Sequence, residues 1–259
     1  MSLATFVTIL TIGLVGSFIS GMLGIGGSIV KYPLLLYIPP LLGVAAFTAH
    51  QVSGISAVQV LFAAGSGVWA YRKGNFLHWK LISYMGSAIL IGSFIGAFGA
   101  KFLPESTINI IYASLATVAA IMMFFSNKEL EEIPVTEITF QRSIAVIASF
   151  IVGILCGIVG AAGAFILVPI MLVVLRIPTR VTIASSLAIT LISSIGTTIG
   201  KLSTGDVLLG PALIMIWASI LGAPLGARIS KHMNTRWLRF ILAALILATS
   251  LKIWMDVLL

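Results

Sequence analysis

Long apolar runs separated by short polar breaks make up almost the whole chain. The runs lie near 5–23, 28–42, 45–70, 79–102, 107–125, 143–159, 164–176, 181–200, 207–228 and 237–256. Several approach the roughly 20 apolar residues that a helix needs to cross a bilayer. They are continuous Leu, Ile, Ala and Gly runs rather than short alternating segments, which favours helices over a transmembrane barrel. The pattern predicts an all-helical integral membrane protein.

The composition supports a lipid bilayer as the surroundings of this chain. Hydrophobic residues make up 59% and charged residues 8%, against about 25% charged in a soluble domain. The formal net charge of +8 would suggest nucleic acid as the partner of a soluble protein. Here the Lys and Arg residues fall in loops between apolar runs, where they set membrane topology. We therefore expect no nucleic-acid partner.

The two sets of five segments repeat the same pattern of glycines. Four residues of the first set recur in the second at a constant offset of 136. Gly21, Gly24, Gly27 and Pro33 correspond to Gly157, Gly160, Gly163 and Pro169. The acidic connector between the sets is the natural boundary. We predict a first membrane repeat over 1–126, a cytoplasmic linker over 127–142 and a second membrane repeat over 143–259.

The loop charges predict how the two repeats are oriented. If each repeat makes an odd number of crossings, eleven Lys and Arg residues lie on the cytoplasmic side and only Lys101, Lys201 and Lys252 lie outside. That bias favours inverted repeats over parallel ones, with both termini outside. The argument allows ten spans, or six spans plus two re-entrant hairpins made by the first two segments of each repeat.

The two glycine-rich breaks are the first candidates for a binding site. Broken helices at matching positions of inverted repeats point to the central site of a transporter. Backbone N–H groups at the start of a helix favour an anion, and Lys31 adds a full charge. The alternatives are close helix packing for the glycines and snorkelling to the interface for Lys31. The candidates from these breaks are Gly24, Ile25, Gly26, Gly27, Ser28, Lys31, Gly160, Ala161, Ala162 and Gly163.

The third segment of each repeat begins with small polar residues that could bind substrate oxygens or bond between helices. They are Thr48, His50, Gln51 and Ser53 in the first repeat and Ser185, Ser186 and Thr190 in the second. His50 is the only histidine inside an apolar segment, so it is the candidate proton carrier. A structural histidine is an equally good interpretation.

Two Gly-x-x-x-Gly motifs, Gly92 to Gly96 and Gly222 to Gly226, predict close contacts between helices. No zinc-protease, nucleophile-elbow or phosphate-loop motif occurs in the sequence. We expect no enzyme activity, no metal site and no cofactor.

The order of the motifs resembles the TauE/SafE family, described as sulfite exporters. The resemblance rests on Ser20 to Gly27 with Pro33 six residues on, the polar patch led by Thr48, and the Gly92–Gly96 helix, all echoed in the second half. It implies a bacterial inner-membrane permease for small sulfur-containing anions such as sulfite, sulfonates or related organosulfur acids. The chain departs from the family pattern at Ser28 and at His50.

Together these features predict a secondary transporter in which two inverted repeats alternate access to a small anionic substrate. A proton or a sodium ion would be the coupling ion. The alternatives are a passive anion channel and a membrane scaffold or assembly partner that transports nothing.

Overall fold

The computed structural model describes residues 2–24, 28–71, 76–124, 135–161 and 163–258, and every regular element in these ranges is helical. The first half holds α1 (Leu3–Leu23), α2 (Ser28–Leu41), α3 (Ala49–Tyr71), α4 (Trp79–Gly99), η2 (Ala100–Phe102) and α5 (Glu105–Phe124). After η3 (Val135–Glu137), the second half holds α6 (Arg142–Val159), α7 (Ala164–Pro169), η4 (Ile170–Val174), α8 (Thr179–Thr204), α9 (Leu209–His232) and α10 (Thr235–Leu258). Each of the ten apolar runs contains a helix, which confirms the all-helical prediction.

Seven helices in the described part of the chain are long and apolar enough to cross a membrane. Large hydrophobic side chains such as Ile91, Trp217 and Phe240 are exposed on the outside of the bundle. Such a surface suits lipid rather than water. The chain is therefore a multi-pass membrane protein.

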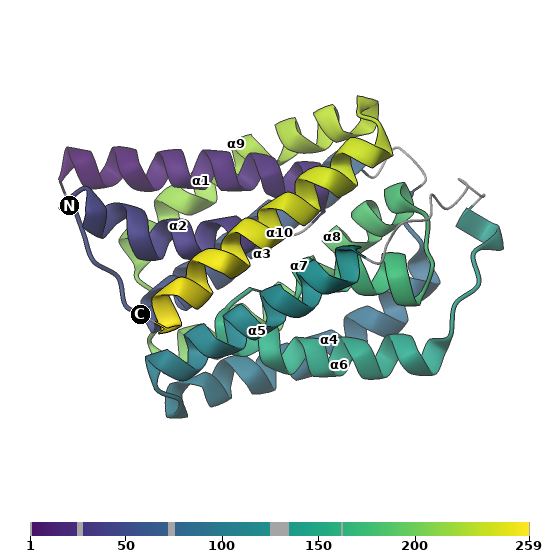
Figure 1. The fold of residues 1–259 in the computed structure, drawn as a ribbon, viewed down its shortest axis with the longest axis horizontal. Helices are drawn as coiled ribbons and strands as arrows, with labels where there is room; N and C mark the ends of the chain where they lie inside the picture. The colour runs from purple at the N-terminus through teal and green to yellow at the C-terminus, as the bar shows by residue number, and fades with distance from the viewer. Residues whose placement is uncertain (1, 25–27, 72–75, 125–134, 162, 259) are drawn as a thin grey trace.

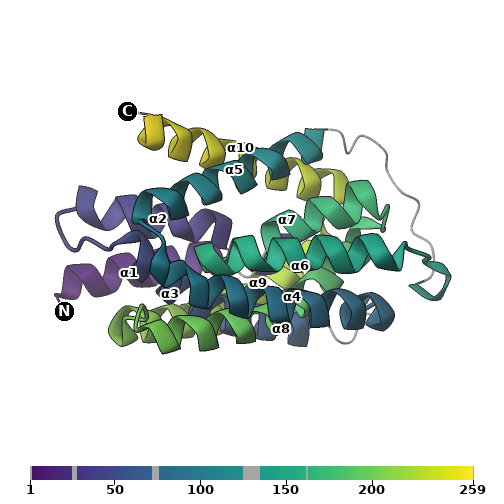
Figure 2. The ribbon, with the colours of Figure 1, turned by 90° about the horizontal axis from the view of Figure 1, so that it is seen from below.

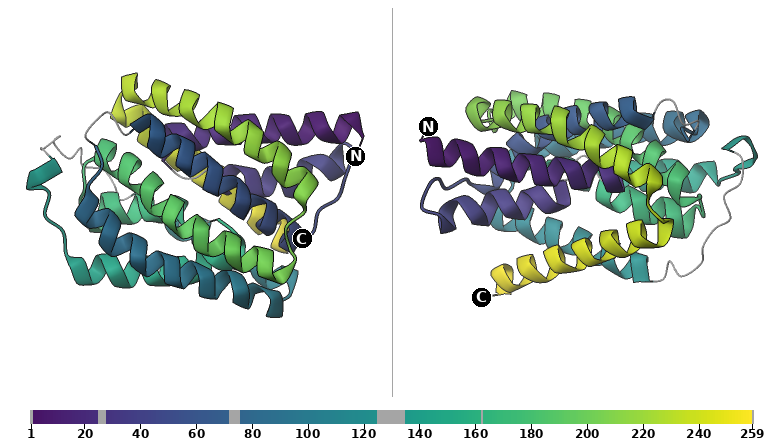
Figure 3. Two further views of the ribbon diagram at one scale, coloured as in Figure 1. Left: turned by 180° about the vertical axis from the view of Figure 1, so that it is seen from behind. Right: turned by 90° about the horizontal axis from the view of Figure 1, so that it is seen from above.

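The helices form two layers (Figures 1 and 2). In one layer, neighbouring helices pack in the order α1, α9, α3, α8, α4 and α6, as the view from behind shows (Figure 3). The other layer contains α2, α10, α5 and α7 in that packing order. The two central helices α3 and α8 are the most enclosed, with 61% and 78% of their apolar windows buried. Polar groups in the middle of these two helices are therefore held away from lipid.

Glycines allow helices of the two halves to approach backbone to backbone. A Cβ atom on Gly21 of α1 would collide with the carbonyl of Ala223 on α9, and one on Gly226 would collide with the carbonyl of Phe18. In the same way, Gly96 of α4 faces the carbonyl of Ile154 on α6. The structure confirms that the two Gly-x-x-x-Gly motifs are helix contacts. It adds that each motif packs on the opposite half of the chain.

Two helical hairpins carry the glycine-rich segments. Helix α1 ends at Gly24 and α6 ends at Gly160, both with positive φ (74° and 77°) that glycine adopts at no steric cost. The returning helices are short: α2 has 14 residues and α7 has 6. The α1–α2 hairpin opens toward the end of the bundle that holds both chain termini, and the α6–α7 hairpin opens toward the other end (Figure 1). The hairpin tips therefore point in opposite directions.

Candidate functional site

A buried polar cluster lies in the middle of the bundle, where α1, α3 and α9 meet. The Gln59 amide nitrogen donates to Ser219 Oγ (2.5 Å) and to Ser17 Oγ (3.2 Å), and the two serine oxygens lie 2.9 Å apart. All three residues are fully buried. The amide oxygen Oε1 of Gln59 has no hydrogen-bond partner among the described residues. A buried polar atom without a partner is costly, and this oxygen is available to accept a hydrogen bond.

Lys31 brings an amino group into the bundle interior beside Ser17. It lies one turn into α2, is fully buried, and packs the methylene groups of its side chain on Gly16, the neighbour of Ser17. Its amino group Nζ has no partner within the described ranges. A charged group in the membrane core is expensive unless something neutralises it. Full burial argues against snorkelling and leaves an amino group that an anion or a polar group can meet.

Further hydroxyls around this region also lack partners in the described residues. They are Ser20 on α1, Ser56 on α3, and Thr190 and Ser193 on α8, all buried. Thr190 lies near the middle of α8, as Gln59 lies near the middle of α3. Within the described ranges, the buried groups without a partner on α1, α2, α3 and α8 thus include one amino group, one amide oxygen and four hydroxyls.

The tips of the two hairpins rest on the N-terminal parts of the central helices. Ser186 of α8 donates its hydroxyl to the carbonyl of Gly24 at 2.8 Å. Ser53 of α3 donates its hydroxyl to the carbonyl of Ile158, just before Gly160, at 3.2 Å. A Cβ atom on Gly160 would collide with Ser53. Each tip is therefore seated on the central helix of the other half.

The structure brings some of the predicted site residues together and separates others. Gly24 meets Ser186, and Gly160 meets Ser53. Ser185 accepts a hydrogen bond from the backbone N–H of His78 at 3.1 Å, so its hydroxyl positions the start of α4. Ala161 and Gly163 are buried in the second tip. Ile25, Gly26, Gly27 and Ala162 lie outside the described residues, and Ser28 is described only as the first residue of α2.

Thr48 and Gln51 form a cap at the start of α3. The Thr48 N–H donates to the Gln51 side-chain oxygen (3.1 Å), and the Gln51 N–H donates to Thr48 Oγ1 (3.2 Å). This reciprocal arrangement is a capping box, with Gln in place of Glu. Both residues therefore have a structural explanation.

His50 lies at the same end of the bundle in a cluster of charged side chains. Its Nδ1 is 3.9 Å from Asp206 Oδ2, and its Nε2 is 3.2 Å from the carbonyl of Leu103. The same Asp206 oxygen accepts from the amino group of Lys201 (3.3 Å) and from the hydroxyl of Thr204 (2.8 Å). His50 is nine residues from Gln59, which places it about 13 Å away along α3. The histidine and the central polar groups are thus separate sites.

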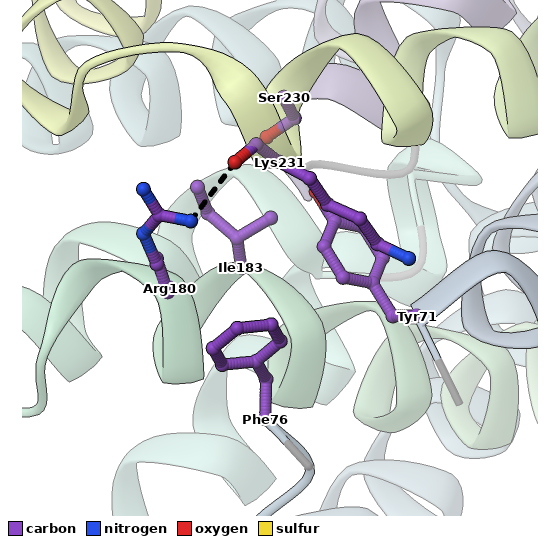
Figure 4. A pocket seen from close by; sticks show the side chains of 6 residues that line it. All are labelled: Tyr71, Phe76, Arg180, Ile183, Ser230 and Lys231. Carbon is purple, nitrogen blue, oxygen red and sulfur yellow. Dashed lines mark hydrogen bonds between the residues drawn. The ribbon is translucent and has the colours of Figure 1, made fainter. Parts of the chain in front are cut away.

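A small basic pocket opens at the opposite end of the bundle, between the end of α3, the start of α8 and the end of α9 (Figure 4). The Arg180 guanidinium donates to the carbonyl of Lys231 at 3.0 Å, and the Lys231 amino group donates to the carbonyl of Ala70. Ile183, which also lines the pocket, touches the tip residue Gly24. Both cations therefore bind helix C-terminal carbonyls, where positive charge is favoured.

Sequence reasoning concentrated on segment ends and so did not select the polar residues at segment centres. These are Ser17, Ser20, Ser56, Gln59, Ser193 and Ser219. The signal was present, because a glutamine in the middle of a membrane segment is rare and commonly functional. Among the described residues, no group of three or more His, Cys, Asp or Glu could hold a metal ion.

The fold and its polar centre define a multi-pass helical membrane protein with a buried lysine and buried polar side chains. The chain belongs to the TauE/SafE family: the family model described as "Sulfite exporter TauE/SafE" matches residues 9–253.

Several relatives match over most of their length. A probable membrane transporter protein YunE of Bacillus subtilis is 26% identical over 90% of this chain and 91% of its own. A probable membrane transporter protein of Xylella fastidiosa is 26% identical over 96% of this chain and 95% of its own length. The probable membrane transporter protein MJ0441 of Methanocaldococcus jannaschii is 23% identical over 92% of this chain and 91% of its own length. No solved structure matches this chain.

Proposed function

We propose that this protein is a secondary transporter of small sulfur-containing anions such as sulfite, sulfonates or related organosulfur acids. The observation that carries the proposal is Lys31, whose fully buried amino group has no partner among the described residues. An anionic oxygen would neutralise this charge. The family supplies the sulfur chemistry, and the names of the relatives agree with transport.

The substrate would bind in the bundle centre between Lys31, Gln59 and the unpartnered hydroxyls of α1, α3 and α8. A sulfur oxyanion presents several acceptor oxygens, which suit an ammonium group and hydroxyl donors. Gly24 and Gly160, at the hairpin tips, would border this site from its two ends. Backbone N–H groups after the tips would add donors of the kind that helix starts provide.

Inverted repeats supply the two alternating conformations in this proposal. The packing orders support them. If each helix of the first half is exchanged with its counterpart in the second (α1 with α6, and so on to α5 with α10), each layer keeps the same packing order, read in reverse. The oppositely directed hairpins also support them (Figure 1). Movement of the first hairpin tip off Ser186 would open one path, and movement of the second tip off Ser53 would open the other. Only one path needs to be open at a time, which is the condition for alternating access.

The positive-inside bias would place the basic end of the bundle in the cytoplasm and both termini outside, in a bacterial inner membrane. The pocket of Arg180 and Lys231 would then face the cytoplasm. Its positive charge would favour anions near the first hairpin tip.

The test is flux of labelled sulfite, sulfate, thiosulfate and short sulfonates into liposomes that contain the purified protein. A transporter predicts saturable flux of at least one anion and acceleration by the same anion on the opposite side, because exchange needs only the loaded conformations. Non-saturating flux without such acceleration would indicate a channel. No flux of any of these anions would overturn the proposed substrate class.

A further inference from the structure

We propose that His50 and Asp206 form a proton-binding site at the end of the bundle, and that the proton couples to transport through the hairpin seat rather than at the anion site. This inference rests on the proposed function, since coupling requires that an anion is moved. It concerns a different place in the fold from Lys31 and Gln59.

The contacts of the two ring nitrogens determine the tautomer of neutral His50. Its Nε2 lies 3.2 Å from the carbonyl oxygen of Leu103. A carbonyl can only accept, so Nε2 must carry a hydrogen in every protonation state that keeps this bond. Neutral His50 then has its lone pair on Nδ1, which faces Asp206 Oδ2 at 3.9 Å. The nitrogen that can gain a proton is therefore the one beside the carboxylate.

Proton binding changes one contact in a defined way. A proton from the adjoining aqueous phase adds to Nδ1, no other bond breaks, and the ring gains one positive charge. The lone pair that faced the carboxylate becomes an N–H directed toward it, so repulsion becomes an ion pair. His50 and Asp206 are 22% and 15% exposed, which leaves the site reachable from water.

Other charged groups around the site make the response specific. Lys201 is fully buried, and its amino group lies 3.3 Å from Asp206 Oδ2, so the carboxylate is shared between the lysine and His50. Glu105, at the start of α5, accepts from the backbone N–H of Ala49 at 2.9 Å, so a second carboxylate lies at the same helix start. Within the described residues, the charged side chains bonded at this site are therefore Lys201 of α8, Asp206 of the α8–α9 turn and Glu105 of α5.

The contact joins parts of the chain that alternating access must move relative to one another. His50 and Leu103 belong to the first half, and Lys201 and Asp206 belong to the second. Ser53, which seats the α6–α7 hairpin tip, lies three residues after His50 and therefore one turn along the same helix. Gly54, the residue after Ser53, already packs against the backbone carbonyl of Asp206, so the ion pair adds to an existing contact between α3 and the α8–α9 turn. A proton on His50 therefore favours the closed seat, and loss of the proton weakens it.

The coupling is tested with the protein in liposomes loaded with a pH dye, using thiosulfate, sulfate or a short sulfonate. Sulfite is avoided because its own protonation would carry protons. The variants are His50→Gln, which keeps a donor for Leu103 but cannot titrate, and Asp206→Asn. The matched control is His232→Gln, which replaces an exposed histidine.

We expect the wild type and H232Q to move protons together with the anion. H50Q and D206N should keep anion–anion exchange within about twofold of wild type and lose at least tenfold in the protons moved per anion. If H50Q moves as many protons per anion as the wild type, the proposal is wrong. If the wild type moves anions without protons, the proposal is also wrong while the transport function stands. If the wild type moves no anion at all, the proposed function itself fails.

A second measurement does not depend on transport. The chain has three histidines, so nitrogen NMR of labelled protein in lipid nanodiscs can assign each ring with the help of the single variants. We expect neutral His50 to carry its hydrogen on Nε2. A hydrogen on Nδ1 in the neutral ring would overturn the proposal.

Discussion

Ser186 of α8 donates its hydroxyl to the carbonyl of Gly24 at 2.8 Å and so ties the tip of the first hairpin to the second half of the chain. The bond lies where the left-handed Gly24 ends α1. In the proposed mechanism, one of the two opening movements breaks this contact. Its strength should therefore affect both the stability of the closed tip and the rate of transport.

Replacing Ser186 by alanine should lower stability by about 1 kcal/mol, because one buried hydrogen bond is lost. Thermal unfolding in detergent micelles measures the change. Ser83→Ala is the matched control: Ser83 is exposed on α4 and donates only within its own helix, to Trp79. Equal melting temperatures for S186A and S83A would contradict the role of Ser186 at the tip.

Adding one methyl group at Gly226 should destabilise the bundle much more than adding one elsewhere on the same helix. A Cβ atom there would collide with the carbonyl of Phe18, whereas a Cβ on Gly210 meets nothing within 4 Å. We expect Gly226→Ala to cost about 1–3 kcal/mol through overpacking. Gly210→Ala should be neutral or slightly stabilising, since alanine is the better helix former. Equal unfolding temperatures for the two variants would contradict the close contact at Gly226.

Removing the Lys231 amino group should weaken the end of α3, because this group donates to the carbonyl of Ala70 in the last turn of that helix. We expect Lys231→Met to lose about 1 kcal/mol. Arg228→Met on the same helix is the control, because Arg228 is exposed. Hydrogen exchange of the last turn of α3 reports the effect locally. Unchanged protection in K231M would show that the contact stabilises nothing.

Gln59 should matter for transport more than for folding. Replacing it by leucine removes the unpartnered oxygen Oε1 and leaves the 2.9 Å contact between Ser17 and Ser219 in place. We expect Gln59→Leu to keep or raise the melting temperature and to reduce anion flux at least tenfold. Wild-type flux in Q59L would exclude Gln59 from the substrate path.

The helices could be predicted from the sequence because apolar run length and glycine position follow directly from the bilayer and from backbone contact. The helix contacts of Gly96 and Gly226 were predictable for the same reason. Their partners were not, because a local motif does not say that α4 packs on α6 and α1 on α9. The capping box of Thr48 and Gln51 has the spacing of a local motif, whereas the sequence-based interpretations of these residues were substrate binding and bonds between helices.

The candidate site was only partly predictable for a related reason. Lys31 was visible as a charge in an apolar run, and its burial against Gly16 needed the packing of α1 on α2. The pairing of His50 with Asp206 joins residues that are far apart in the sequence. Contacts of this kind depend on tertiary packing, which a single sequence does not display.

The proposed anion site depends on the buried amino group of Lys31, and anion flux in Lys31→Met tests this role most directly. Methionine keeps the length and removes the charge, and Lys101→Met is the control because Lys101 is exposed and lies over the rings of Phe98 and Phe102. We expect K31M to fold with an unchanged or higher melting temperature and to raise the KM for the transported anion at least tenfold, as the loss of a charged hydrogen bond implies. K101M should match the wild type. A folded K31M with wild-type KM and flux would contradict the proposal that this lysine binds the substrate.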